Sequence, residues 1–174
     1  MAPYVALNTA ARLSHSNGKV KFFWLLTGSV VMGSGVWSMH FVGMLAFHLN
    51  VPMDYNGWLT LLSLLASVIA SFIAFYVTLP KRINRYSIVI GGSFMATGII
   101  AMHYIGMEAM IMPVKIIYHK PLLILSIVIA FIASYAALFL FLRFRHDYTS
   151  NPKMWLSAIL MGIAICGMHY TGMN

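Results

Sequence analysis

The sequence predicts an all-α fold, a polytopic transmembrane helix bundle, and three observations lead to it. The chain has 174 residues, of which 61% are hydrophobic and only 8% are charged, a balance that soluble domains do not have. Apolar stretches of about 20 residues, the length that crosses ~30 Å of hydrocarbon, occur five times. A short motif recurs three times along the chain. We therefore expect three tandem two-helix repeats, with the motif on every second helix.

The five apolar stretches define five full membrane spans, at about 22–45, 58–79, 86–107, 122–142 and 154–173. The opening segment "MAPYVALNTAARL" is too short to cross and lacks the charged start and cleavage pattern of a signal peptide. Its "YVAL" matches "ASYAAL" and "ASFIAF" of later helices from the aromatic onward. We expect it to be the end of a truncated first helix. The chain is then a single membrane domain, 1–174, with repeats of about 1–50, 51–112 and 113–174.

The cationic side chains predict the orientation in the membrane. Nine lysines and arginines fall in the first, third and fifth loops, and only Lys115 and Lys120 fall in the intervening loops. By the positive-inside rule, the first, third and fifth loops are expected on the cytoplasmic side of the inner membrane. The net charge of +8 is then a topology signal together with attraction to anionic lipid. No basic stripe with interleaved aromatic residues indicates nucleic acid, and we discard that partner.

The repeated motif reads "MHFVGM" at 39–44, "MHYIGM" at 102–107 and "MHYTGM" at 168–173. Its histidines are 63 and 66 residues apart, and a methionine also recurs eight residues before each of them, so nine of the fourteen methionines occupy repeated positions. Every motif helix runs from the cytoplasm outward, which puts the three histidines at one depth near the outer face. Parallel repeats are related by an axis along the membrane normal, so the histidines are expected to converge.

Helical geometry places soft ligands on the same face. At about 100° per residue, the methionine four positions after the histidine, the one before it and the one eight before it share an arc with it. The glycine three positions on lies in this arc too, and we expect it to let a neighbouring backbone approach closely. No chemistry is assigned to the glycine.

This set of side chains suits a soft metal. Thioether sulfur is a good ligand for Cu(I) and a poor one for zinc, magnesium or calcium, while imidazole binds copper in both oxidation states. The candidate ligands are His40, His103 and His169, with Met44, Met107 and Met173 one turn on, and Met39, Met102 and Met168 as second choices. In the structural alternative the methionines fill core gaps and the histidines hydrogen-bond one another or backbone carbonyls, although intramembrane ionisable groups are functional by default.

Other polar residues carry weaker signals. Cys166 shares the helical face of His169, but Trp37 and Ile100 hold the matching positions, so the repeat does not support it as a ligand. Asp54 and Glu108 are either acceptors that orient an imidazole or solvated interfacial residues. With three acidic residues in all, the chain offers no carboxylate pair or Ser/His/Asp set, and we do not expect it to be an enzyme.

Three M-H-[YF]-x-G-M motifs on alternate membrane helices resemble the MHYT domain family, bacterial integral membrane sensor modules. The resemblance implies a copper site near the outer face that senses oxygen, carbon monoxide or nitric oxide. It also implies a cytoplasmic output domain of the GGDEF or EAL type, which acts on cyclic di-GMP and which this chain does not contain. Phe41, Val42 and Ile105 depart from the family's pattern, which indicates that His and Met carry the function.

A mechanism and two alternatives follow as hypotheses. A diatomic ligand, or a change in copper oxidation state, would alter the set of His and Met ligands and shift the motif helices against one another. In one alternative, paired histidines hold haem in a membrane electron-transfer protein. In the other, a copper transporter passes ions along a methionine ladder that includes Met32, Met95 and Met161, about 12 Å deeper on the same face. The metal, the gas, the number of ions and the oligomeric state stay open.

Overall fold

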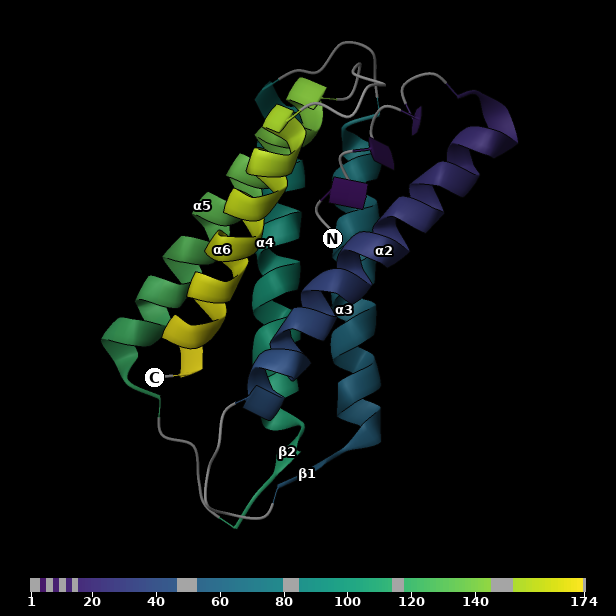
Figure 1. Ribbon diagram of the computed structural model, residues 1–174. Coiled ribbons are helices and arrows are strands. Elements are labelled where there is room, and N and C mark those ends of the chain that lie inside the picture. Colours follow the sequence, from purple (N-terminus) through teal and green to yellow (C-terminus); the bar gives the residue numbers. More distant parts are fainter. Residues whose placement is uncertain are drawn as a thin grey trace.

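The structure is a computed structural model that describes residues 4–5, 8–9, 12–13, 16–46, 53–79, 85–113, 118–144 and 152–173. Its helices are α2 (Gly18–Ala46), α3 (Gly57–Val77), α4 (Arg85–Glu108), α5 (Lys120–Phe144) and α6 (Pro152–Met173), and it has two short strands, β1 (Asp54–Tyr55) and β2 (Met110–Ile111) (Figure 1). All five helices are long and apolar enough to cross a membrane. The predicted all-α bundle and its five spans are therefore confirmed.

Helix α2 is longer than its predicted span. It begins at Gly18, whose φ of 55° marks the turn into the helix, and takes in Lys19 and Lys21 before the apolar run starts. Hydropathy marks the part of a helix that lies in hydrocarbon, whereas backbone hydrogen bonding continues into the interface. The sequence therefore predicted the span and not the end of the helix.

The helices pack so that the motif-bearing ones meet inside the bundle. Consecutive helices are neighbours: α2 packs on α3, α3 on α4, α4 on α5 and α5 on α6. Helix α2 also contacts α4 and α6 and crosses the bundle obliquely (Figure 1). Two interhelical hydrogen bonds hold α2 against α3: Ser67 Oγ donates to the Gly33 carbonyl over 3.0 Å, and Trp37 Nε1 donates to Ser63 Oγ over 3.1 Å.

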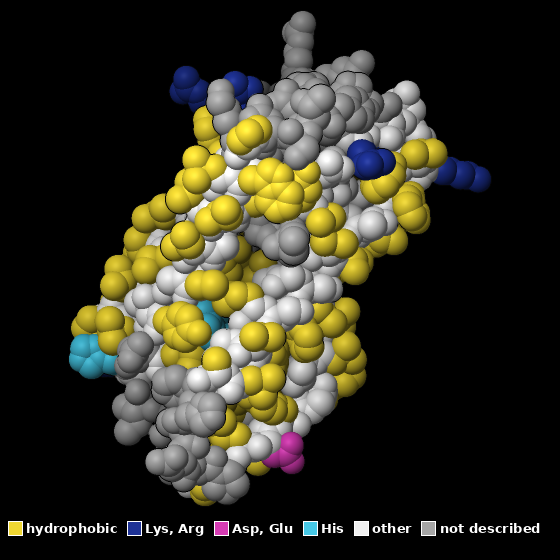
Figure 2. Space-filling model, in the orientation of Figure 1, with side chains coloured by type: hydrophobic (Ala, Val, Ile, Leu, Met, Phe, Trp, Pro, Cys, Tyr) yellow, Lys and Arg dark blue, Asp and Glu magenta, His cyan; other side chains and the backbone are white. Residues whose placement is uncertain are grey.

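Charged side chains gather at the two ends of a largely apolar surface (Figure 2). Arg12, Lys19, Lys21 and Arg85 lie at one end, beside or within the first turns of α2 and α4, and Arg143 lies in the last turn of α5. The motif histidines lie toward the opposite end, in the last two turns of their helices. This separation matches the predicted clustering of cations. The assignment of the cationic end to the cytoplasm stays a prediction.

Some expectations fall where the structure describes little. The end of a first helix is expected on residues 1–13, of which 4–5, 8–9 and 12–13 are described, all in helical conformation. There, the Tyr4 ring stacks on Trp155 at 4.0 Å, and the Arg12 guanidinium lies 4.7 Å from the Trp24 ring. The other residues of that segment, and several loop cations (Lys81, Arg82, Lys115 and Arg145), lie outside the described residues.

Strands β1 and β2 join the α2–α3 connection to the α4–α5 connection at the histidine end. They pair antiparallel, with Asp54 opposite Ile111 and Tyr55 opposite Met110. Asn56 extends the link, because its backbone N–H donates to the Ala109 carbonyl over 2.8 Å, and its side chain caps α3. Two residues per strand are too few to show alternation in a sequence, so this small sheet was not predicted.

Candidate metal centre

The structure brings the three motif histidines into direct contact. His40, His103 and His169 are each 0% exposed. The Nδ1 atom of His40 lies 3.1 Å from that of His103 and 3.1 Å from that of His169, and the third Nδ1 pair is 3.4 Å apart. The three ring planes are nearly perpendicular to one another, at 82°, 87° and 89°. The predicted convergence of the repeats is thus found, and it takes place through one ring atom of each histidine.

Three Nδ1 atoms this close cannot all be satisfied by hydrogen bonds with one another. In the plane of its ring, each nitrogen carries either a hydrogen or a lone pair. If one of the three nitrogens carries a hydrogen, the other two turn their lone pairs toward each other. If two of them carry hydrogens, those two N–H groups face each other. A cation at the centre would accept all three lone pairs. Imidazole nitrogens lie about 2.0–2.1 Å from a bound zinc, which separates the nitrogens of a trigonal or tetrahedral set by about 3.3–3.6 Å. The observed separations, 3.1–3.4 Å, are close to that range, so these residues fit a metal.

The far nitrogen of each ring forms no hydrogen bond of normal geometry, although a backbone group of Gly172 lies close to His103. The Nε2 atoms of His40, His103 and His169 are buried without a hydrogen-bond partner among the described residues. Leaving a buried N–H unpaired costs about 1–3 kcal/mol, a cost that a packed apolar core would avoid. Asp54 and Glu108 are exposed and make no contact with these atoms, so the structure does not support them as acceptors that orient an imidazole.

Aromatic rings enclose the histidines. The residue after each histidine packs edge-on against its ring: Phe41 at 4.9 Å, Tyr104 at 4.8 Å and Tyr170 at 5.1 Å. A second ring follows in two repeats, with Tyr55 at 5.6 Å from Phe41 and Tyr118 at 5.6 Å from Tyr104. Tyr55 and Tyr118 come from the connections at the histidine end. They are 63 residues apart, as His40 and His103 are, so this layer was visible in the sequence as a repeat that we did not interpret.

A comparison with protein-family models gives the family of this chain. A family model described as "MHYT: Bacterial signalling protein N terminal repeat" matches residues 33–91 and 97–150, well over half of the chain. The chain belongs to the MHYT family. Each matched range begins within a motif helix: the first runs from α2 through α3 into α4, and the second runs from α4 through α5. No solved structure matches this MHYT domain.

Curated relatives contain the same domain within longer chains. The bifunctional diguanylate cyclase/cyclic di-GMP phosphodiesterase MucR of Pseudomonas aeruginosa is 45% identical over 99% of this chain and 25% of its own length. The signaling protein YkoW of Bacillus subtilis is 39% identical, and the cyclic di-GMP phosphodiesterase NbdA of P. aeruginosa is 35% identical, each over 99% of this chain and 22% of its own length. The chain therefore spans about a quarter of the length of these relatives.

The candidate methionine ligands of this MHYT domain lie on the interior side of their helices. Four are buried and two are half-buried; the buried ones are Met44, Met102, Met107 and Met168, and the half-buried ones are Met39 and Met173. The helical-wheel prediction that they share the histidine face is consistent with this burial. Their role as ligands stays a prediction, because buried thioethers also serve as core packing.

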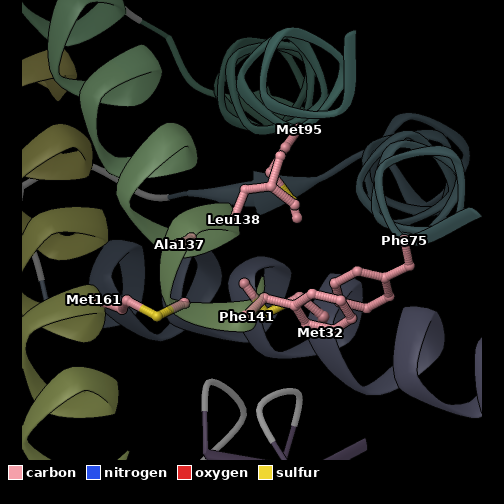
Figure 3. A pocket seen from close by; sticks show the side chains of 7 residues that line it. All are labelled: Met32, Phe75, Met95, Ala137, Leu138, Phe141 and Met161. Carbon is pink, nitrogen blue, oxygen red and sulfur yellow. The ribbon is translucent and has the colours of Figure 1, made fainter. Parts of the chain in front are cut away.

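The deeper methionines line a common cavity. Met32, Met95 and Met161 reach it from α2, α4 and α6, and Phe75, Ala137, Leu138 and Phe141 complete its wall (Figure 3). The two phenylalanine rings stack at 4.6 Å. The cavity measures about 10 Å³, room for about one water, but its wall offers no hydrogen-bonding group, so we expect it to be dry.

The remaining candidate, Cys166, is not part of the centre. Its thiol is half-buried, and the group of potential metal ligands whose atoms lie within 4.8 Å of one another consists of the three histidines alone, among the described His, Cys, Asp and Glu residues. This agrees with the absence of cysteine from the matching positions of the other repeats.

Proposed function

We propose that this domain is a copper-binding membrane sensor in which His40, His103 and His169 hold the ion through Nδ1. The observation that carries the proposal is the convergence of three Nδ1 atoms within 3.1–3.4 Å in a fully buried centre. Three imidazoles alone suit zinc as well as copper. The motif methionines around them favour copper, because thioether sulfur is a better ligand for Cu(I) than for zinc.

The residues of the chain would bind, orient and shield the ion. The aromatic layer of Phe41, Tyr104 and Tyr170 restrains the three imidazoles, and the buried helix faces exclude water. Copper, when bound, supplies an exchangeable oxidation state and an affinity for diatomic ligands such as oxygen, carbon monoxide or nitric oxide. Because the ligand preferences of the two oxidation states of copper differ, a change of state would alter how tightly the three histidines hold the motif helices together.

Such a change would pass along the motif helices. Each of α2, α4 and α6 contributes one histidine near one end and runs toward the opposite end, where the cations of α2 and α4 lie. If that end is cytoplasmic, as the positive-inside rule predicts, the ion sits near the periplasmic face of the inner membrane. The helices then connect it to the cytoplasm. Signalling of this kind requires two packings of the bundle that bind the ligand differently.

The output is proposed to be cytoplasmic and to act on cyclic di-GMP. MucR and NbdA are named as enzymes of cyclic di-GMP, and this chain covers the domain that they share with it. We infer that the domain controls a GGDEF- or EAL-type output domain, in the same protein or in a partner, and is not itself an enzyme.

Infrared spectroscopy tests the gas-binding part of the proposal. Copper-loaded, reduced protein in mild detergent is exposed to carbon monoxide, and the C–O stretching band of a copper carbonyl is expected. His103→Ala should abolish the band, while His119→Ala, which changes an exposed histidine, should leave it unchanged. Absence of the band from copper-loaded wild-type protein would contradict gas sensing at this ion.

Of the two alternatives, haem fits the geometry poorly. Axial imidazoles bind opposite faces of a porphyrin, whereas here three Nδ1 atoms are in mutual contact, with no space for a macrocycle between them. A Soret band in the purified protein would overturn this conclusion.

Copper transport keeps one observation in its favour, the cavity that Met32, Met95 and Met161 share. Uptake of copper by proteoliposomes, lost in the triple Met→Leu variant at these positions, would support a transporter. Copper binding without uptake would support a sensor.

A further inference from the structure

Each motif glycine faces the histidine of a different repeat. A Cβ atom added at Gly43 would lie 2.5 Å from Nε2 of His169, and one added at Gly172 would lie 2.6 Å from Nε2 of His103. Gly106 meets Nε2 of His40 in the same way. The sequence had suggested that these glycines admit a neighbouring backbone. The structure corrects this, because the group that they admit is an imidazole.

The three contacts form a closed cycle. The histidine of α2 rests on the glycine of α4, that of α4 rests on the glycine of α6, and that of α6 rests on the glycine of α2. Within one copy of the motif, the histidine and the glycine therefore serve two different contacts. A rotation of any one ring would press on the next helix.

The contact also defines which edge of the ring faces inward. In all three contacts the nearest atoms are Nε2 and then Cδ2, with Cε1 third. The glycine therefore takes the edge opposite Nδ1, and Nδ1 is left pointing at the other two histidines. The imidazole has little freedom to move away, because an aromatic ring and two other imidazoles already pack against it.

Other glycines in the same helices do not make this contact. Gly33 of α2 faces the backbone of Val68, with an added Cβ 2.6 Å from its Cα. Gly162 and Gly167 of α6 face open space within 4 Å. Small residues at helix crossings are common in membranes, but of the twelve glycines whose surroundings the structure describes, only the three motif glycines meet a histidine.

We propose that Gly43, Gly106 and Gly172 are positioning residues, each of which seats the imidazole of another repeat with Nδ1 toward the centre. The seating rests on the geometry alone, and its consequence for metal binding rests on the proposed function. A methyl group at any one glycine would displace one Nδ1 and leave the other two in place.

A double-mutant cycle on metal-free protein in detergent tests the seating. Gly43→Ala is expected to lower the midpoint of thermal unfolding by about 2–10 °C, because a methyl group in a packed site costs about 1–3 kcal/mol. In a His169→Ala background the ring is gone, so the same substitution should have almost no effect. In a His40→Ala background it should keep its full effect, since His40 rests on Gly106.

Gly33→Ala is the matched control. It introduces a contact of similar closeness on the same helix, yet its effect should be equal with and without His169. Gly167→Ala should be neutral. If Gly43→Ala alone does not fold, rescue by His169→Ala supports the seating, and failure of that rescue overturns it. Equal effects of Gly43→Ala in the wild-type and His169→Ala backgrounds would overturn it as well.

A second readout separates the seating from the metal site. In copper-loaded protein, X-ray absorption should count one nitrogen ligand fewer in Gly43→Ala than in Gly33→Ala, with a loss of copper affinity of about 10–100-fold. An unchanged count and affinity in Gly43→Ala would overturn the positioning role. Coupling between Gly43 and His169 in a protein that binds no copper would contradict the proposed function and leave the seating intact.

Discussion

Nδ1 of His40 lies 3.1 Å from Nδ1 of His169, although 129 residues separate the two in the chain. The contact closes the bundle, because it joins the motif helix of the first repeat to that of the third. His103 lies against both. The three repeats therefore share one centre in the interior, and a change at that centre acts on all of them together.

Because the three histidines are equivalent in this arrangement, single substitutions should have equal effects. We expect His40→Ala, His103→Ala and His169→Ala each to weaken copper binding by at least about tenfold, as one of three nitrogen ligands is lost. Competition with a chromogenic Cu(I) chelator measures the affinity. A single variant that binds like the wild type would show that its histidine is not a ligand, and the site would then hold only two nitrogens.

The motif methionines should decide which metal is preferred. Met→Leu substitutions preserve volume at small cost in stability, so the triple variant at Met44, Met107 and Met173 is expected to fold. It should lose preference for Cu(I) over zinc, because only the three nitrogens remain. Metal competition followed by elemental analysis measures this preference. The same substitutions at Met39, Met102 and Met168 test the second-choice ligands, and an unchanged preference in both triple variants would assign the methionines to packing.

The stacked pair beside the methionine cavity should contribute strongly to stability. Phe75 is 2% exposed and lies on Phe141 at 4.6 Å, so Phe75→Ala enlarges a cavity whose wall offers no hydrogen-bonding group. Moving the phenyl ring from the protein interior into lipid costs little, because both surroundings are apolar. The expected loss of about 1–3 kcal/mol in the free energy of unfolding therefore comes from the enlarged cavity. Phe139→Ala is the control, because Phe139 is 65% exposed on the outer face of α5. Thermal unfolding in detergent should show a lower midpoint for the first variant only; equal midpoints would contradict the packing described here.

Tyr55 and Tyr118, which pack on Phe41 and Tyr104, predict that the protein loses stability at alkaline pH. Burial raises the pKa of Tyr55, and burial together with the nearby Glu108 carboxylate raises the pKa of Tyr118. A raised pKa in the folded state means that folding disfavours tyrosinate. The stabilisation is therefore complete below about pH 10, the unfolded value, and is lost as the pH rises through the folded pKa.

The corresponding experiment is a pH series of unfolding midpoints. The midpoint of the wild type should fall above about pH 10, and the fall should be smaller in Tyr55→Phe/Tyr118→Phe. Tyr86→Phe, at a side chain that is 77% exposed, should follow the wild type. Identical profiles for all three proteins would contradict the burial of Tyr55 and Tyr118 described here.

The repeats carry most of what the sequence could predict. Five spans, three equivalent histidines and their meeting point all followed from hydropathy and from a motif with fixed spacing, since tandem repeats in a membrane are related by a common axis. Burial of Met102 and Met107 followed from the helical period. These features depend on local pattern and on the symmetry of the repeats, and both can be identified in a sequence.

What escaped prediction depends on contacts between repeats. The helical wheel placed Gly43 on the histidine face, but it could not show that the neighbour there is His169, because rotation and offset of packed helices are not encoded in the period of either one. The edge of the imidazole that faces the centre was open for the same reason. Tyr55 and Tyr118 repeat with the 63-residue spacing of His40 and His103, and comparing the loops as well as the helices would have found them.

The central claim, that the three histidines hold a metal, is tested most directly by elemental analysis of copper-loaded protein in mild detergent. The account predicts about one equivalent of copper in the wild type and none in the variant with His40, His103 and His169 all replaced by alanine, with both proteins folded by circular dichroism. Equal copper in the two proteins would contradict it.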